Sequence, residues 1–232
     1  MEERAGRLRI KGLSKAFTEA GRRHPVLHAL DLAVRAGETL ALVGRSGSGK
    51  TTLLNLISGI ELPDSGEVWV GDTCLSALNE RERTLFRRHH LGFVFQFFNL
   101  IPTLTVLENV LLPLELSGRI EARRRRALDL LEEVGLAERR DSYPDRLSGG
   151  EQQRVAVVRA IVHEPLLLLA DEPTGNLDEE SGQTVLALFR NLVQRTDTTM
   201  VMVTHSREVA SLADRVYRMR DGRVSAQEEE SG

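Results

Sequence analysis

The residues of this chain best suited to chemistry form a glycine-rich loop that can hold a phosphate. Gly-x-x-x-x-Gly-Lys-Thr spans residues 44–51 and follows an apolar run, Thr39–Val43, typical of a buried strand. Glycines let main-chain N–H groups turn toward an anion, while Lys50 supplies a positive charge at the γ-phosphate and Thr51 a hydroxyl for Mg²⁺. A chance glycine-rich turn is the alternative, but the flanking strand and helix patterns favour nucleotide binding. The candidate residues are Gly44, Arg45, Ser46, Gly47, Ser48, Gly49, Lys50, Thr51 and Thr52.

Two adjacent carboxylates end another apolar run, Leu166–Ala170. Asp171 can hold Mg²⁺ directly or through water, and Glu172 can accept a proton from an attacking water. Taken alone, the pattern fits a buried strand that runs into an acidic turn equally well. The phosphate loop elsewhere in the chain favours the catalytic interpretation.

Three further polar residues lie next to predicted strands or helices. Gln96 follows the predicted strand Leu91–Phe95, and its amide could reach both metal and water, although a solvated strand end explains it too. His205 follows the predicted strand Thr199–Val203; a neutral imidazole there could bond the γ-phosphate, although a lone histidine is more often structural. Asp178 could bridge two subunits or simply cap a helix.

A second glycine-containing segment, residues 147–151, could hold another phosphate. Gly149 and Gly150 would each weaken a helix interior by ~1 kcal/mol relative to alanine. At a helix N-terminus, with Ser148 before them, they allow a phosphate to approach closely. Because the chain already has one complete phosphate loop, this segment indicates contact with the ATP of another subunit. A plain capping box between Ser148 and Glu151 is the alternative.

In combination and in this order, these residues resemble the ATP-binding-cassette (ABC) ATPases, and the resemblance covers nearly the whole chain. It implies an α/β fold with a P-loop RecA-like core, an antiparallel β subdomain, and a helical subdomain at about residues 100–159. Residues 1–232 would then form a single nucleotide-binding domain. The resemblance also implies a head-to-tail homodimer that encloses two Mg-ATP molecules, each between a phosphate loop and the opposing segment 147–151. Phe17 stands where an aromatic side chain is expected to stack on adenine.

A finer resemblance connects the chain to the lipoprotein-release and macrolide-export branch of that family. It rests on residues 91–96, 99–102, 104–105, 108–110 and on ADEPTGNLD at 170–178. The ATPases of this branch work with membrane subunits, which implies a cytoplasmic protein that is peripheral on the inner face of the cell membrane. Arg45 and the pair Val157–Val158 depart from the usual pattern and leave the subtype open.

Two other functions compete with an ATP-driven transporter subunit. A soluble cassette ATPase could act on nucleic acid or ribosomes, but such proteins usually carry tandem cassettes or long insertions, and this chain has neither. A binding switch without turnover is the third possibility. The complete set Lys50, Asp171, Glu172 and His205 argues against it.

Composition narrows the choice of partners. The chain has 232 residues, one cysteine and a net charge of −3. Because the net charge is slightly negative, the chain has no overall electrostatic attraction to nucleic acid, and no nucleic-acid partner is expected. The basic run Arg123–Arg126 is interpreted as a solvated helix face. Apolar runs are far shorter than the ~20 residues of a membrane helix, so the protein is expected to be soluble and to reach the membrane through a partner.

The elements that must position these residues follow from periodicity and caps. Phe93 and Phe95 alternate along a predicted strand and are expected in the core. Phe97 and Phe98 lie near a groove that, in the family, receives a helix of the membrane subunit; we expect at least one to be partly exposed, with ordinary core packing as the alternative. The remaining expectations are strands at Leu8–Leu13 and Leu30–Val34, helices at 51–58, 79–88, 121–134, 149–162 and 179–194, a helix opened by a capping box at Thr105 and Glu108, a hairpin turn at Asp221–Gly222, and an acidic tail at about 227–232.

Overall fold

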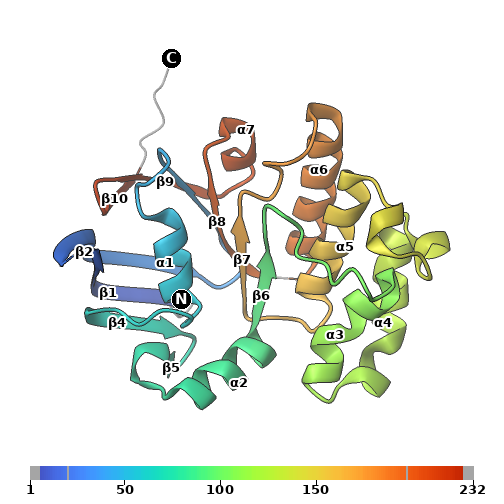
Figure 1. Cartoon of the computed structure of the whole chain (residues 1–232), viewed down its shortest axis with the longest axis horizontal. Coiled ribbons are helices and arrows are strands. Elements are labelled where there is room, and N and C mark those ends of the chain that lie inside the picture. Colours follow the sequence, from blue (N-terminus) through green and yellow to red (C-terminus); the bar gives the residue numbers. More distant parts are fainter. Residues whose placement is uncertain (1–5, 20, 197, 227–232) are drawn as a thin grey trace, which may run out of the picture. The chain divides into compact units, whose positions relative to one another are not determined.

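The computed structural model describes residues 6–19, 21–196 and 198–226, which fall into two compact units (Figure 1). The first unit contains the chain up to Thr84 and from Thr199 onward, and the second is Leu85–Thr198. The predicted acidic tail lies outside the described residues. The single-domain interpretation and the boundaries of the helical subdomain stay predictions.

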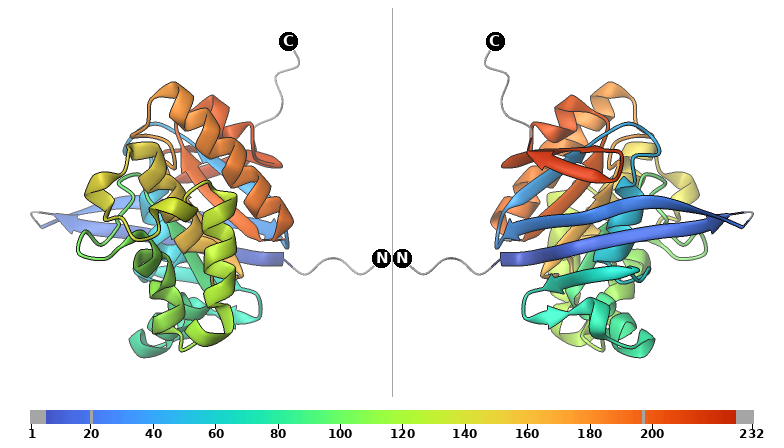
Figure 2. Two further views of the ribbon diagram at one scale, coloured as in Figure 1. Left: turned by 90° about the vertical axis from the view of Figure 1, so that its right-hand side faces the viewer. Right: turned by 90° about the vertical axis from the view of Figure 1, so that its left-hand side faces the viewer.

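The N-terminal half of the first unit is an antiparallel sheet of order β2-β1-β4-β5. Its two long strands form an extended ribbon, clearly seen in the right-hand view of Figure 2. Alternate residues such as Leu8 and Ile10 are buried and pair with Val34 and Leu32, as expected for a half-buried sheet. The sheet confirms the predicted antiparallel subdomain. Its strands are β1 (Gly6–Glu19), β2 (Arg22–Arg35), β4 (Ser65–Val70) and β5 (Thr73–Cys74).

A second group of strands in the same unit has the order β10-β9-β3-β8. The central strand β3 runs parallel to both of its neighbours, and its residues Leu40, Ala41 and Leu42 are fully buried. The predicted turn at Asp221–Gly222, where both residues have positive φ, joins the last two strands. The strands are β3 (Thr39–Val43), β8 (Thr199–Thr204), β9 (Arg215–Arg220) and β10 (Arg223–Ala226), and the short helices of this unit are α1 (Lys50–Ile57), η1 (Leu75–Ala77) and α7 (Arg207–Ala210).

The second unit is mostly helical around one parallel strand pair, β6 and β7, in which Val94 lies opposite Ala170. Residues 100–159, all of which the structure describes, contain helices and loops and no strand. The elements are β6 (Leu91–Val94), α3 (Val106–Leu116), α4 (Ile120–Glu133), η2 (Ala137–Arg139), η3 (Pro144–Arg146), α5 (Gly149–Ile161), β7 (Leu167–Asp171) and α6 (Glu179–Arg195). Helix α2 (Glu80–His90) begins in the first unit and ends in the second.

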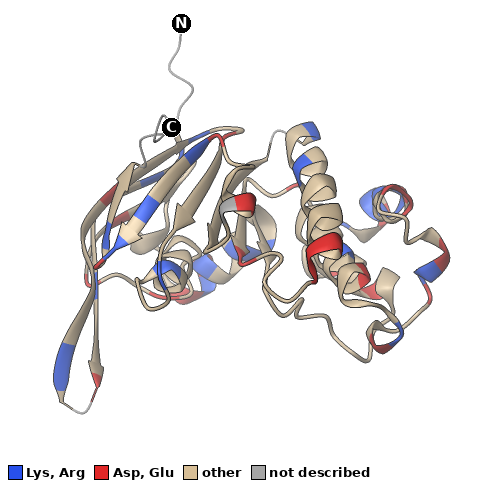
Figure 3. Ribbon diagram, turned by 90° about the horizontal axis from the view of Figure 1, so that it is seen from above, with Lys and Arg blue, Asp and Glu red and all other residues tan. Residues whose placement is uncertain are grey.

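Local signals explain where these helices begin. Thr105 and Ser148 both form complete capping boxes, with Glu108 and Glu151 as their partners. Helix α6 carries acidic residues in its first turn and Arg195 in its last, the charge order that favours the helix dipole (Figure 3). None of the helices formed by the described residues has the length and apolarity needed to span a membrane.

The basic run on α4 is paired rather than simply solvated. Arg123 and Arg126 contact Glu164 at 2.5 Å and 3.3 Å, and Arg125 contacts Asp129 at 2.8 Å. Arg123 and Arg126 are half-buried and Arg124 and Arg125 are exposed, so the face is at least partly solvated, and the ion pairs with Glu164 are a feature that the sequence did not show. Glu164 and Asp129 partly neutralise the charge of the four arginines, which weakens the attraction of this helix face for a polyanion.

Candidate functional site

The phosphate loop follows β3 directly and closes tightly on itself. A Cβ atom at Gly44 would lie 2.5 Å from the Met219 carbonyl oxygen and 2.8 Å from Ser48 Oγ, so only glycine fits there. Gly47 and Gly49 have φ of 77° and 99°, which glycine alone adopts at little cost. The pattern at 44–51 therefore has a structural need for each of these glycines.

Lys50 lies over the loop that precedes it. Its Nζ donates to the main-chain oxygens of Gly44 at 2.7 Å and Arg45 at 3.1 Å. The ammonium group thus lies at the loop, at the first residue of α1, where the helix also contributes unpaired N–H groups. A positive charge beside a helix N-terminus is an arrangement that favours an anion.

His205 belongs to the same unit and to the adjacent strand end. Val43 and Thr204 are paired in the parallel register of β3 and β8, so Gly44 and His205 are the next residues along two neighbouring strands. The imidazole-bearing residue is exposed. The structure therefore brings His205 and the phosphate loop to the same edge of the sheet.

The second unit has an equivalent edge, at the ends of β6 and β7. Because Val94 pairs with Ala170, Asp171 at the end of β7 and Glu172 just after it follow this pair on one side, and the segment that leads to Gln96 follows it on the other. Glu172 has a φ of 45°, a left-handed conformation that is rare for a residue with a side chain. Strain of this kind costs about 1–3 kcal/mol and is common at functional sites.

Gln96 is held against the segment that follows these carboxylates. Its Nε2 donates to Asn176 Oδ1 at 3.2 Å, and Asn176 Nδ2 donates to the Gln96 carbonyl oxygen at 2.9 Å. A Cβ at Gly175 would come within 3.0 Å of Gln96 Nε2, so the glycine provides room for the amide. Asn176 belongs to the ADEPTGNLD segment at 170–178, but the sequence did not indicate this reciprocal pair of hydrogen bonds with Gln96.

Residues 148–151 form the start of α5, as predicted. The Ser148 Oγ accepts from Glu151 N at 3.3 Å, and Ser148 N donates to Glu151 Oε2 at 2.8 Å. That hydrogen bond from the main chain lowers the pKa of the Glu151 carboxyl. Ser148 is exposed, Gly149 is half-buried and Gly150 is buried. The capping box is therefore real, and a role for Ser148, Gly149, Gly150 and Glu151 at a nucleotide of another copy stays a prediction.

Asp178 caps α6 by accepting from Ser181 N at 2.9 Å, and this hydrogen bond lowers the pKa of its carboxyl. Phe17, on β1, is 40% exposed and has the Lys15 ammonium 5.1 Å from its ring centroid. An exposed ring face is what stacking on a base requires. Both roles proposed from the sequence stay predictions.

Two polar side chains of α5 that the sequence did not single out hold neighbouring loops. Gln153 is fully buried, and its Nε2 donates to the Pro173 carbonyl oxygen, just after Glu172. Arg159 donates to the carbonyl oxygens of Asn99 at 2.6 Å and Phe98 at 2.7 Å. All three bonds go to main-chain atoms distant in sequence, so no sequence signal could have identified them.

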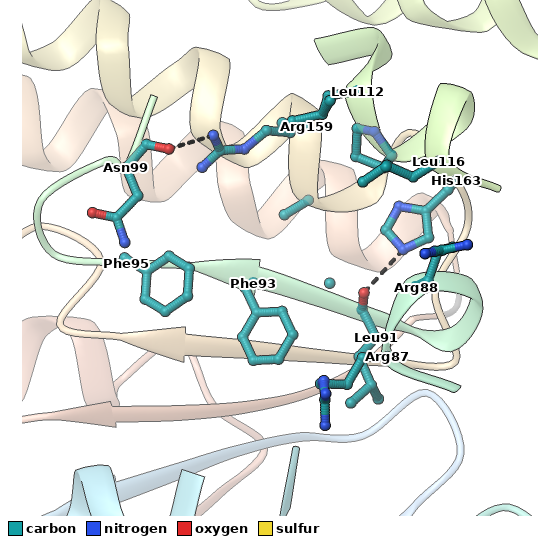
Figure 4. Close-up of a pocket in the computed structure, with 13 residues that line it drawn as sticks. Arg87, Arg88, Leu91, Phe93, Phe95, Asn99, Leu112, Leu116, Arg159 and His163 are labelled. Atoms are coloured by element: carbon teal, nitrogen blue, oxygen red, sulfur yellow. Dashed lines mark hydrogen bonds between the residues drawn. The ribbon is translucent and has the colours of Figure 1, made fainter. Parts of the chain in front are cut away.

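A cavity of about 300 Å³ lies in the second unit, with Arg159 in its wall (Figure 4). Phe93 and Phe95 line it and stack on each other, with ring centroids 5.6 Å apart and an interplanar angle of 3°. Both are only half-buried, so their predicted place in the core was wrong: Phe93, on β6, and Phe95, just after its end, face the cavity. Phe97 is 72% exposed and Phe98 is half-buried, which agrees with the expectation that at least one is accessible.

The residues expected to hold Mg²⁺ have suitable donor atoms. Thr51 offers a hydroxyl, Asp171 a carboxylate and Gln96 an amide oxygen, and Mg²⁺ prefers such oxygen ligands. The described residues contain no cluster of three or more His, Cys, Asp or Glu that could enclose a metal. Such a set suits Mg²⁺ that arrives with a nucleotide, since that ion usually takes one or two protein ligands together with phosphate oxygens and water.

Comparisons with known proteins agree on one family. The family model described as ABC transporter matches residues 27–175. The chain is 51% identical over 220 residues to an uncharacterized ABC transporter ATP-binding protein, Rv0986, of Mycobacterium tuberculosis, covering 94% of this chain and 88% of that protein. It is 46% identical over 224 residues to the lipoprotein-releasing system ATP-binding protein LolD of Xanthomonas campestris pv. campestris, covering 96% and 94%.

Solved structures give the same result. A dimeric, post-hydrolysis state of the ATP-binding cassette MJ0796, bound to ADP and Pi, matches with a TM-score of 0.86 and 39% identity over 97% of this chain and 99% of that one. Another dimeric structure of this cassette matches with a TM-score of 0.85. These matches confirm the predicted α/β P-loop cassette fold.

Proposed function

Because the chain belongs to the ABC transporter family and is an ATP-hydrolysing subunit of that family, we propose that it hydrolyses Mg-ATP to drive a separate membrane subunit of the lipoprotein-release and macrolide-export type. The observation that carries this proposal is the pair of strand edges described above. One edge bears the phosphate loop and His205, and the other bears Asp171, Glu172 and Gln96. The comparisons give no support to action on nucleic acid, and the ATPase activity of the family argues against a binding switch without turnover.

The proposed chemistry assigns one role to each group. Lys50 and the N–H groups of the loop would bind the β- and γ-phosphates, and Thr51, Asp171 and Gln96 would hold a Mg²⁺ ion, which would neutralise part of the phosphate charge. A water attacks the γ-phosphorus, its proton passes to Glu172, and the bond to the leaving oxygen of ADP breaks. His205 would donate or accept a hydrogen bond at the γ-phosphate.

We further propose that two copies form a head-to-tail dimer in the ATP-bound state. Ser148, Gly149 and Gly150 would then contact the nucleotide of the opposite copy, and Asp178 would lie near the junction. Two observations support this arrangement: α5 begins with an exposed serine and two glycines, and the similar MJ0796 cassette is dimeric with ADP and Pi bound. Phe17 would stack on adenine.

The proposed membrane partner places the protein at the cytoplasmic face of the cell membrane. The relatives that support it are named as components of a lipoprotein-releasing system. In this chain, the exposed Phe97 next to Gln96 offers an apolar contact for a helix of that partner.

Replacing Glu172 with glutamine tests the hydrolytic role. The variant loses the proton acceptor, so turnover should fall about 100-fold or more, while ATP binding persists and a dimer accumulates. Steady-state phosphate release and size-exclusion chromatography with ATP measure the two effects. Glu180→Gln, an exposed carboxylate on α6, is the matched control. Near-normal turnover of Glu172→Gln would remove Glu172 from its assigned role.

Partner binding is tested separately with Phe97→Ser and Phe98→Ser. These variants should reduce copurification of the membrane subunit in mild detergent while ATP binding and folding persist. Ile60→Ser, which alters an apolar side chain of similar exposure (54%) in the first unit, is the control. Undiminished copurification with soluble, folded variants would argue against a contact at these phenylalanines.

A further inference from the structure

The Arg159 side chain makes an unusual set of contacts at the wall of the cavity. Its guanidinium donates to two consecutive main-chain carbonyls, those of Phe98 and Asn99, and Figure 4 shows the second bond. No carboxylate forms an ion pair with it among residues 6–19, 21–196 and 198–226. Burial lowers the pKa of the Arg159 guanidinium, because holding a charge away from water costs free energy.

The two residues that it holds have an unfavourable backbone conformation. Phe98 and Asn99 have φ of 57° and 50°, both in the left-handed region. The left-handed conformation is unfavourable for a residue with a side chain, less so for asparagine, and it persists only when its surroundings maintain it. A planar guanidinium can bond both carbonyls at once, whereas an ammonium is a single point donor on a flexible stem.

This turn lies immediately after Gln96. The Phe98 N–H donates to the Phe95 carbonyl oxygen at 3.3 Å, so the chain reverses around Gln96 itself. On the other side of the turn, Gln96 forms its reciprocal pair with Asn176 over Gly175. The direction of the Gln96 side chain therefore depends on a turn that Arg159 holds in place.

We propose that Arg159 is a positioning residue for Gln96, keeping the left-handed turn at 98–99 closed so that the amide stays beside the segment after Glu172. The inference rests on the proposed role of Gln96 at the metal and the attacking water. Arg159 touches neither the nucleotide nor the reacting atoms in this role. It acts on the rate only through the loop.

The test is a double-mutant cycle on kcat. Arg159→Met removes both donors at similar side-chain length, and Gln96→Ala removes the positioned group. We expect Arg159→Met to lower kcat about ten-fold or more with the KM for ATP little changed, because the phosphate loop is untouched. In the Gln96→Ala background the same substitution should have no further effect. Arg159→Lys, which keeps the charge but loses the fork, should fall between wild type and Arg159→Met.

The control separates positioning from stability. Arg123→Met breaks an ion pair in the same unit and should lower the Tm without lowering kcat. An Arg159→Met or Arg159→Lys kcat equal to wild type, or an equal loss with and without Gln96, would overturn the inference while leaving the ATPase function intact. Wild-type turnover by Gln96→Ala would instead contradict the role of Gln96, and this inference with it.

Discussion

At Gly44 the main chain leaves no room for a side chain, and this has a direct consequence for nucleotide binding. A methyl group there would press on the Met219 carbonyl oxygen and on Ser48 Oγ. We therefore expect Gly44→Ala to displace the loop and to weaken nucleotide binding about ten-fold or more. Titration with a fluorescent ATP analogue measures the change.

Gly71 provides the matched control for that substitution. A Cβ at Gly71 meets nothing within 4 Å, although this residue, unlike Gly44, has a positive φ of 57°. Gly71→Ala should cost about 1 kcal/mol of folding stability and leave nucleotide affinity unchanged. Equal affinities for the two variants would mean that crowding at Gly44 has no influence on the loop.

Residues at strand ends were the most predictable part of the site. Gly44, Asp171 and His205 follow apolar runs directly, so their positions at strand ends were predictable, whereas their roles were inferred only from the combination of motifs and stay predictions. The contacts of Gln153, Asn176 and Arg159 were not predictable, because each bonds to atoms that come close to it only after folding. Phe93 and Phe95 were placed wrongly, since alternation gives the two faces of a strand but not what covers each face.

Helix α3 illustrates how one element orders the loop that precedes it. Asn109 is fully buried, and its amide accepts from Ile101 N at 2.8 Å and donates to the Ile101 and Leu104 carbonyl oxygens at 3.1 Å and 3.0 Å. Asn109→Ala would remove the hydrogen bonds of the buried amide to the Ile101 N–H and the Leu104 carbonyl oxygen, whereas the Ile101 carbonyl oxygen would still accept from Leu104 N at 3.1 Å. We expect it to lower the free energy of unfolding by about 2–3 kcal/mol, measured by urea denaturation.

The N-cap residue of the same helix, Thr105, provides a variant with which the loss of unfolding free energy in Asn109→Ala can be compared. Thr105→Ala removes one hydroxyl from an exposed capping box and should cost only about 1 kcal/mol. If Asn109→Ala cost no more than Thr105→Ala, the buried amide would not be the main support of the loop.

Helix starts were predictable to within a residue or two, because Thr105, Ser148 and Asp178 act locally. Strand lengths were not. The expected strand Leu8–Leu13 continues to Glu19, where β1 and β2 pair through several register shifts. Such irregular pairing depends on the partner strand, and it blurs the alternation on which sequence prediction relies.

For the molecule as a whole, buried histidine makes stability depend on pH. His163 is 3% exposed, and burial lowers its pKa from 6.5; the same cause lowers the pKa of His90. Between the folded and unfolded pKa values the unfolded chain binds more protons, so stability is constant above about pH 7.5 and falls as the pH drops through about 6.5. The Tm should therefore decrease between about pH 7.5 and 5.5.

His163→Gln isolates the contribution of that residue. Glutamine can replace the donor to the Leu91 carbonyl oxygen, 3.0 Å from His163 Nε2, without ionising. The Tm of His163→Gln should decrease less than that of the wild type over this pH range. The Tm of His24→Gln, a substitution at an exposed histidine, should decrease as much as that of the wild type. The lowered carboxyl pKa values act only at more acidic pH. If the Tm of His163→Gln fell with pH as steeply as that of the wild type, His163 would not be the cause of the pH dependence.

The buried amide of Gln153 ties the first turns of α5 to the backbone just beyond Glu172. In a head-to-tail pair, the serine at the front of that helix would face one triphosphate while the carboxylate serves the other. A movement of Ser148 or of the segment after Glu172 would then also move the other. Helix α5 of each copy would thus respond to both bound ATP molecules. Hydrolysis at the two sites of the dimer would then be coupled rather than independent.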